Sequence, residues 1–242
     1  MQYTQYKEVN SIIRKILHGA ENLFPDNFIG MYLHGSLVIG DFDETVSDID
    51  LLVVVNNPLT DPEINSLQQF HEQLPIEHPN WEDRIEVAYL ARGALRTFDK
   101  KRNTIGIISP GETFHTIQAG KDWIMSWFIV REHSKIISGP NPKELIRPIS
   151  FQEYSDCVES YLMIFKGLLR ENHRQGFQAY VILTMCRGLS TLLDREYLSK
   201  KKSAEWAIKR FPEWADLISD ALIWRLDKAS NKKMTKCHFL TP

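Results

Sequence analysis

Two acidic residues that follow a Gly-Ser pair form a pattern able to hold a metal-bound nucleotide. Leu33-His34-Gly35-Ser36 ends one short apolar run and, after eleven intervening residues, Asp48-Ile49-Asp50 begins another. Since side chains alternate along a β-strand, the two aspartates should project from the same face. Neighbouring carboxylates repel each other unless a cation lies between them, and magnesium favours carboxylates together with phosphate oxygens. The spacing therefore predicts a metal site at a strand start.

Gly35 and Ser36 have the features of a phosphate-binding turn. Gly35 ends a strand-like run, and glycine allows the backbone to turn close to a ligand. Ser36 offers a hydroxyl and an N–H group where a helix or turn should begin, and such termini bind phosphate. Gly-Ser alone is common in turns, but ahead of two aspartates it predicts a triphosphate site. The preceding His34 could line this site, but a structural role is favoured.

Glu86 is the third acidic residue of the expected site. It lies in the run 84–90 between Ile85 and Val87, where an acid is costly unless it has a cation or a function. If that strand lies beside the one bearing Asp48 and Asp50, three carboxylates converge. We expect Glu86 to act as general base on an acceptor hydroxyl, and it could also share the metal.

The elements that position these residues follow from apolar periodicity. Short apolar runs predict buried strands, and spacings of three and four predict amphipathic helices. The predicted strands are 28–33, 49–55 and 84–90, and the predicted helices are 9–23, 62–74, 123–130, 154–169, 179–193, 203–209 and 214–226. This order predicts an α+β fold, with a mixed sheet and helices followed by an all-α bundle.

A domain boundary is expected near residue 148. The segment 138–142, Ser-Gly-Pro-Asn-Pro, is a strong breaker and Pro148 follows it, which divides the chain into domains 1–148 and 149–242. Few elements can be predicted within 91–148, and the tail 231–242 shows no periodicity.

Composition excludes several classes of protein. The 242 residues carry a formal net charge of −2, which argues against nucleic acid as a partner. The three distant cysteines, Cys157, Cys186 and Cys237, predict neither a disulfide framework nor a zinc site, and the first two are expected in the core. No signal-peptide stretch or membrane-spanning run occurs, so the cytoplasm is expected and a membrane is not. A P-loop and a G-x-S-x-G elbow are both missing.

The Gly-Ser pair, the D-x-D motif and the later strand acid resemble the nucleotidyltransferase superfamily, whose founder fold is the polymerase-beta palm. More closely, the chain is similar to bacterial aminoglycoside adenylyltransferases acting on streptomycin and spectinomycin. The similarity covers most of residues 30–215. The segments that carry it are Arg131-Glu132-His133-Ser134, Gly139-Pro140 with Pro148, Val181–Arg187, Ser199-Lys200 and Ala204–Ala207.

The resemblance implies ATP and two magnesium ions, enclosed with the acceptor between an N-terminal nucleotidyltransferase domain and a C-terminal helical domain. Within the first domain it implies that Ser36 touches the phosphates. It further implies that Asp48 and Asp50 bind magnesium and that Glu86 is the catalytic base.

Arg187 and Lys200 are implied by the same resemblance to reach the ATP phosphates from the helical domain. Arg187 lies in an apolar helix, where a buried arginine needs either an acidic partner or a phosphate. Lys200 precedes a predicted helix, and a triphosphate needs counter-charge beyond magnesium. The adjoining Lys201 and Lys202 are expected in a solvated loop.

The acceptor follows less directly from the sequence. Streptomycin-modifying members of the family carry a Trp and an Asp just before the helix that matches Val181–Arg187. This chain reads ENHRQGF at 171–177, with His173 and Phe177 nearest to those positions. The missing acid argues against streptomycin and leaves spectinomycin or another hydroxyl compound. The alternatives are a non-antibiotic acceptor, a catalytically silent ATP-binding sensor and a toxin–antitoxin partner.

Overall fold

The computed structural model describes residues 2–100, 103–171 and 174–226, which fall into two units. Unit 1 contains the residues up to Val38 and Asp48–Ile149, and unit 2 contains Ile39–Ser47 and the described residues from Ser150 on. The division after Ile149 lies next to the boundary expected at residue 148. The segment Ile39–Ser47, which the sequence had assigned to the first domain, groups with unit 2.

Contacts of Asp41 explain this grouping. Its Oδ2 accepts a hydrogen bond from the backbone N–H of Lys201 (3.4 Å) and lies 4.0 Å from Nη1 of Arg225. The segment between the Gly-Ser pair and the first aspartate is thus tied to unit 2 by charge and hydrogen bonding, which periodicity does not reveal.

Among the described residues, unit 1 is built on a six-stranded mixed sheet of order β5-β4-β3-β2-β1-β6. β2 and β3 are parallel, and the other neighbouring strands are antiparallel. The strands are β1 (Phe28–His34), β2 (Ile49–Val55), β3 (Ile85–Ala91), β4 (Thr104–Ile108), β5 (His115–Gln118) and β6 (Lys135–Ser138). The predicted α+β class is confirmed, and the three predicted strands form the centre of the sheet.

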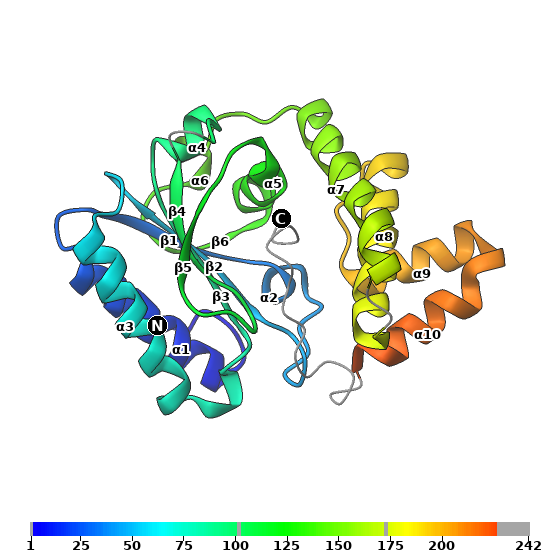
Figure 1. The fold of residues 1–242 in the computed structure, drawn as a ribbon, viewed down its shortest axis with the longest axis horizontal. Helices are drawn as coiled ribbons and strands as arrows, with labels where there is room; N and C mark the ends of the chain where they lie inside the picture. Colours follow the sequence, from blue (N-terminus) through cyan, green and yellow to red (C-terminus); the bar gives the residue numbers. More distant parts are fainter. Residues whose placement is uncertain (1, 101–102, 172–173, 227–242) are drawn as a thin grey trace. The chain divides into compact units, whose positions relative to one another are not determined.

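Helices cover both faces of this sheet (Figure 1). On one face, His71 of α3 lies 2.9 Å from the hydroxyl of Tyr89 in β3 (Nε2 to Oη). Because side chains alternate along a strand, Glu86 projects from the opposite face. The helices of unit 1 are α1 (Lys7–Leu23), α2 (Ser36–Ile39), α3 (Asp61–Glu77), α4 (Ala94–Thr97), α5 (Ile124–His133) and α6 (Pro142–Leu145), with 3-10 turns η1 (Pro79–Trp81) and η2 (Lys121–Trp123).

The crossover through α3 allows the two central strands to pair in parallel. Parallel strands need such a connection, and α3 begins with a capping box in which Thr60 and Glu63 satisfy each other's backbone N–H groups. The result is a parallel ladder that pairs Asp50 with Glu86.

Unit 2 is helical in its described residues from Phe151 on. Its elements are α7 (Phe151–Glu171), α8 (Gln175–Asp194), α9 (Lys200–Arg210), η3 (Pro212–Trp214) and α10 (Ala215–Leu226). Small side chains let α8, α9 and α10 pack closely, and the buried cluster is Ala179, Leu183, Cys186, Ala204, Ala207, Ile218 and Ala221. Cys186 is therefore a core residue as expected, Cys157 is only half-buried, and Cys237 and the tail lie outside the described residues.

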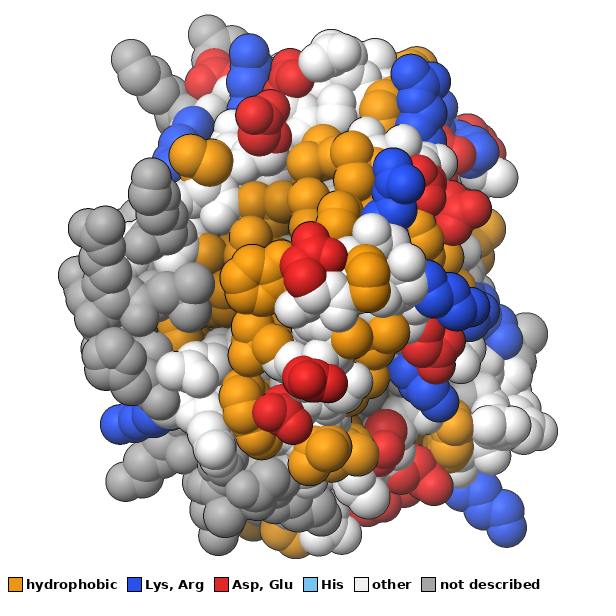
Figure 2. All heavy atoms as spheres, turned by 90° about the vertical axis from the view of Figure 1, so that its right-hand side faces the viewer, with side chains coloured by type: hydrophobic (Ala, Val, Ile, Leu, Met, Phe, Trp, Pro, Cys, Tyr) orange, Lys and Arg blue, Asp and Glu red, His pale blue; other side chains and the backbone are white. Residues whose placement is uncertain are grey.

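Several large apolar side chains of this unit are not part of its core and are exposed at the surface. Trp214 and Ile223 are 56% and 66% exposed, and hydrophobic side chains gather across the face shown in Figure 2. Within the described part of the chain, no helix combines the length and apolar character needed to cross a membrane.

Candidate active site

Asp50 and Glu86 are direct neighbours across the parallel ladder of β2 and β3. A hydrogen bond from the N–H of Ile49 to the carbonyl of Arg84 (2.9 Å) extends the pairing to the strand starts. Residues that face each other in a ladder share one face of the sheet, so both carboxylates project to the same side. The structure thus brings these two predicted residues together.

Asp48 directly precedes β2, two residues before Asp50, and all three acidic side chains are partly exposed. Among the described residues, no three His, Cys, Asp or Glu side chains are already grouped as a metal site. Magnesium fits these residues nonetheless, because it is usually held by one or two carboxylates with substrate phosphates and water completing its shell. Asp48 and Asp50 would supply the carboxylates, while Glu86 as a metal ligand stays a prediction.

Gly35 lies against the carboxylate of Asp50. Its φ is +68°, in the left-handed region that favours glycine, and a Cβ atom there would collide with the Asp50 side chain. Ser36 begins the short helix α2, as the sequence predicted, and the N–H of Val38 donates to the carbonyl of Gly35 at 3.1 Å. The Gly-Ser pair therefore turns the chain beside Asp50, one of the three acidic residues (Asp48, Asp50 and Glu86) that are called the acidic cluster below.

Gly35→Ala should abolish magnesium-dependent ATP binding, because the added methyl group must displace the Asp50 carboxylate. The left-handed backbone alone should cost about 1–2 kcal/mol. Gly40→Ala is the matched control, since Gly40 has a φ of +77° with nothing within 4 Å of an added Cβ. Urea unfolding should show a similar backbone penalty in both variants, and calorimetry should show lost nucleotide binding only in Gly35→Ala. Equal nucleotide affinity in the two variants would contradict the contact.

His34 lies beside Asp50 and Glu86, which agrees with the less favoured of the two roles expected from the sequence, that of a residue lining the site. It faces Asp50 across β1 and β2, so His34, Asp50 and Glu86 form a row over three strands. Burial lowers the pKa of His34 to about 4, although the charge of Glu86 acts to raise it. The imidazole is therefore neutral at neutral pH. Only the β1–β2 register reveals its place.

Arg187 and Lys200 lie in unit 2. Arg187 is in α8, and Lys200 is the first residue of α9, with its Nζ over the ring of Tyr180 at 4.9 Å from the centroid. The helix begins three residues earlier than predicted, because the Ser199 side chain accepts a hydrogen bond from the N–H of Lys202 (3.2 Å) and caps it. Lys202 is thus helical and exposed, not part of a loop.

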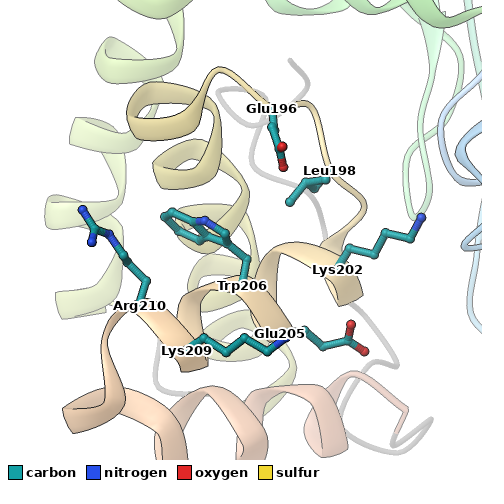
Figure 3. A pocket seen from close by; sticks show the side chains of 7 residues that line it. All are labelled: Glu196, Leu198, Lys202, Glu205, Trp206, Lys209 and Arg210. Atoms are coloured by element: carbon teal, nitrogen blue, oxygen red, sulfur yellow. The ribbon is translucent and has the colours of Figure 1, made fainter.

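Unit 2 also has an open pocket along α9 (Figure 3). The residues that line it are Glu196, Leu198, Lys202, Glu205, Trp206, Lys209 and Arg210. Acidic and basic side chains are mixed there, and neither Arg187 nor Lys200 contributes to the lining. Its charges therefore do not single out a phosphate ligand.

Two family models match this chain. The "Nucleotidyltransferase domain" matches residues 13–108, and the "Aminoglycoside adenylyltransferase, C-terminal domain" matches residues 144–238. The first match contains the acidic cluster and the Gly-Ser turn, and the second contains Arg187 and Lys200.

Known proteins resemble the chain over most of its length. The Spectinomycin 9-adenylyltransferase of Campylobacter jejuni is 24% identical over 213 residues, covering 83% of this chain and 79% of that protein. The Aminoglycoside (3'') (9) adenylyltransferase of Escherichia coli is 26% identical, covering 85% and 80%. The crystal structure of spectinomycin adenyltransferase AAD(9) from Enterococcus faecialis with ATP and spectinomycin matches with a TM-score of 0.70, 20% identity and coverage of 95% and 94%. The last comparison shows a shared fold.

Proposed function

Because this chain belongs to the adenylyltransferase family, with a nucleotidyltransferase domain and an aminoglycoside adenylyltransferase C-terminal domain, we propose that it transfers AMP from ATP to a hydroxyl group of a small molecule. The observation that carries the proposal is the pairing of Asp50 with Glu86, beside a Gly35 whose position admits no side chain. One acid can accept a proton there while the other holds a cation.

Magnesium is the cation that Asp48 and Asp50 would hold. Bound there with the ATP phosphates, it would neutralise phosphate charge and favour the departure of pyrophosphate. A second ion, with Glu86 among its ligands, is part of the same proposal.

In the proposed reaction, the acceptor hydroxyl gives its proton to Glu86, and its oxygen forms a bond to the α-phosphorus of ATP. The bond from that phosphorus to the oxygen bridging to the β-phosphorus breaks, and pyrophosphate leaves with the electron pair. Ser36 would contact the phosphates, and Arg187 and Lys200 would supply positive charge as the leaving group forms. Much of the rate enhancement would come from positioning.

For the acceptor we propose an aminocyclitol such as spectinomycin. The names of the relatives support this, since the protein from Campylobacter jejuni is a spectinomycin 9-adenylyltransferase and the matching crystal structure contains spectinomycin. His173 and Phe177 are the positions nearest to the Trp and Asp of the streptomycin-modifying enzymes. The Phe177 side chain is 4% exposed because it packs in the protein interior, and His173 lies outside the described residues. The relatives' names support spectinomycin, and a buried phenylalanine supplies no acid for streptomycin at that position.

A pyrophosphate-release assay tests the proposal. With magnesium, ATP and spectinomycin we expect steady release of pyrophosphate, and with GTP, CTP or UTP, or without acceptor, release near background. Release with ATP and a hydroxyl compound from outside the antibiotics would move the proposal to a non-antibiotic acceptor. ATP binding without release from any acceptor would indicate a nucleotide sensor, and it would contradict the transferase proposal.

A further inference from the structure

Four tyrosines lie close enough to Arg187 to act on its charge. The described part of unit 2 contains four, Tyr154, Tyr161, Tyr180 and Tyr197, and all four act on the guanidinium of Arg187. Burial acts to lower the pKa of Arg187, but the negative charge that these tyrosines gain when they ionise at high pH outweighs it and leaves the pKa raised. The guanidinium therefore remains charged at any working pH.

These tyrosines leave the positive charge uncancelled. A phenol is neutral at pH 7, so the four hydroxyls can accept hydrogen bonds but carry no charge. Within the part of the chain that the structure describes, no ion pair joins Arg187 to a carboxylate. The sequence analysis allowed two partners for the Arg187 charge, an acidic side chain or a phosphate. This environment favours the phosphate.

Tyr180 links this cluster to the second predicted phosphate ligand. Its ring lies under the Lys200 ammonium, with Nζ 4.9 Å from the ring centroid, which is within the range of a cation–π interaction. Its hydroxyl lies 2.7 Å from that of Tyr161, and the ring of Phe165 packs edge-on against it at 6.0 Å. Contacts with Tyr161 and Phe165 thus hold the Tyr180 side chain in place. One face of its ring remains in contact with the Lys200 ammonium.

We propose that Tyr180 is a positioning residue, whose ring holds the Lys200 ammonium beside the Arg187 cluster so that unit 2 presents two fixed cations to the phosphates of ATP. The inference rests on the proposed function. A lysine side chain has four rotatable bonds, and holding it before ATP arrives removes part of the ordering cost of binding. The ring face, rather than the hydroxyl, performs this task.

A double-mutant cycle on magnesium-ATP affinity tests the proposal. Tyr180→Met removes the ring, and it should weaken binding about tenfold, which lies between the typical effects of exposed and fully desolvated cation–π contacts because Tyr180 and Lys200 are both half-buried. Tyr180→Phe keeps the ring and should bind within about twofold of the wild type. Lys200→Met should bind more weakly than either, and adding Tyr180→Met to it should cause no further loss, because Tyr180 acts through Lys200.

Phe151→Leu is the matched control, since it removes the ring under Arg195, 4.7 Å from the guanidinium carbon, elsewhere in the same unit. Its ATP affinity should equal that of the wild type. Thermal unfolding checks that each variant is folded, and Tyr180→Leu replaces Tyr180→Met if the latter is not. Additive losses in the cycle, or equal losses in Tyr180→Phe and Tyr180→Met, overturn the positioning role. A wild-type protein that binds no ATP overturns the proposed function itself.

Discussion

Replacing Glu86 by glutamine should abolish adenylyl transfer while ATP binding remains nearly intact. Glutamine has the shape of glutamate, but its amide does not accept a proton, so the acceptor hydroxyl loses its base. General bases contribute about 10²–10⁴-fold to a rate, and we expect a loss of that order in the turnover number. Pyrophosphate release measured at saturating ATP and acceptor gives the rate, and calorimetry gives the affinity for magnesium-ATP.

Glu82→Gln provides the control for this variant, because Glu82 is an exposed acid four residues earlier and its loss changes the net charge equally. Its turnover should match the wild type. Persistent turnover in Glu86→Gln would remove Glu86 from the base role. A variant that loses ATP affinity as well as turnover would show that ATP binding depends on Glu86 as a metal ligand, and it would contradict a role confined to the base.

The centre of the sheet could be predicted because it is buried on both faces. β2 was predicted at 49–55, and the structure has Ile49–Val55. Such strands form continuous apolar runs, and an acid within one, as Asp50 and Glu86 are, stands out against its neighbours. The cluster in unit 1 was predictable for that reason.

The edges of the sheet could not be predicted in this way. β5 has only four residues, His115–Gln118, and alternates between half-buried and exposed side chains. β6 also has four residues and β4 has five, and their strand conformation comes from pairing with residues distant in sequence. Windows of four or five residues hold too little periodicity to distinguish a strand from a loop.

The tyrosine cluster of unit 2 marks a second limit. Tyr154 and Tyr161 lie on α7, Tyr180 lies on α8, and Tyr197 lies between α8 and α9. From the sequence, each of the first three is predicted to lie on the apolar face of its helix. Their convergence on Arg187 depends on how the helices pack, and spacing within one helix does not contain that information.

Asp50→Asn should lose magnesium-dependent ATP binding without losing the fold. An amide oxygen is a weaker ligand than a carboxylate, and one negative charge is removed from the expected metal site. ATP titrations at several magnesium concentrations should show affinity that rises with magnesium in the wild type and stays low in the variant. Glu44→Gln, an exposed acid in the segment between the motifs, should behave like the wild type.

The thermal stability of Asp50→Asn shows whether the Asp50 carboxylate serves metal binding or the fold. Neighbouring carboxylates at Asp48, Asp50 and Glu86 repel each other without a cation, so neutralising one should leave the magnesium-free protein as stable as the wild type or slightly more stable. Gly35→Ala displaces the same carboxylate, and combining it with Asp50→Asn should therefore weaken ATP binding no further than Asp50→Asn alone. Normal ATP affinity in Asp50→Asn, or a marked loss of its thermal stability, would show that this carboxylate serves the fold and not the metal.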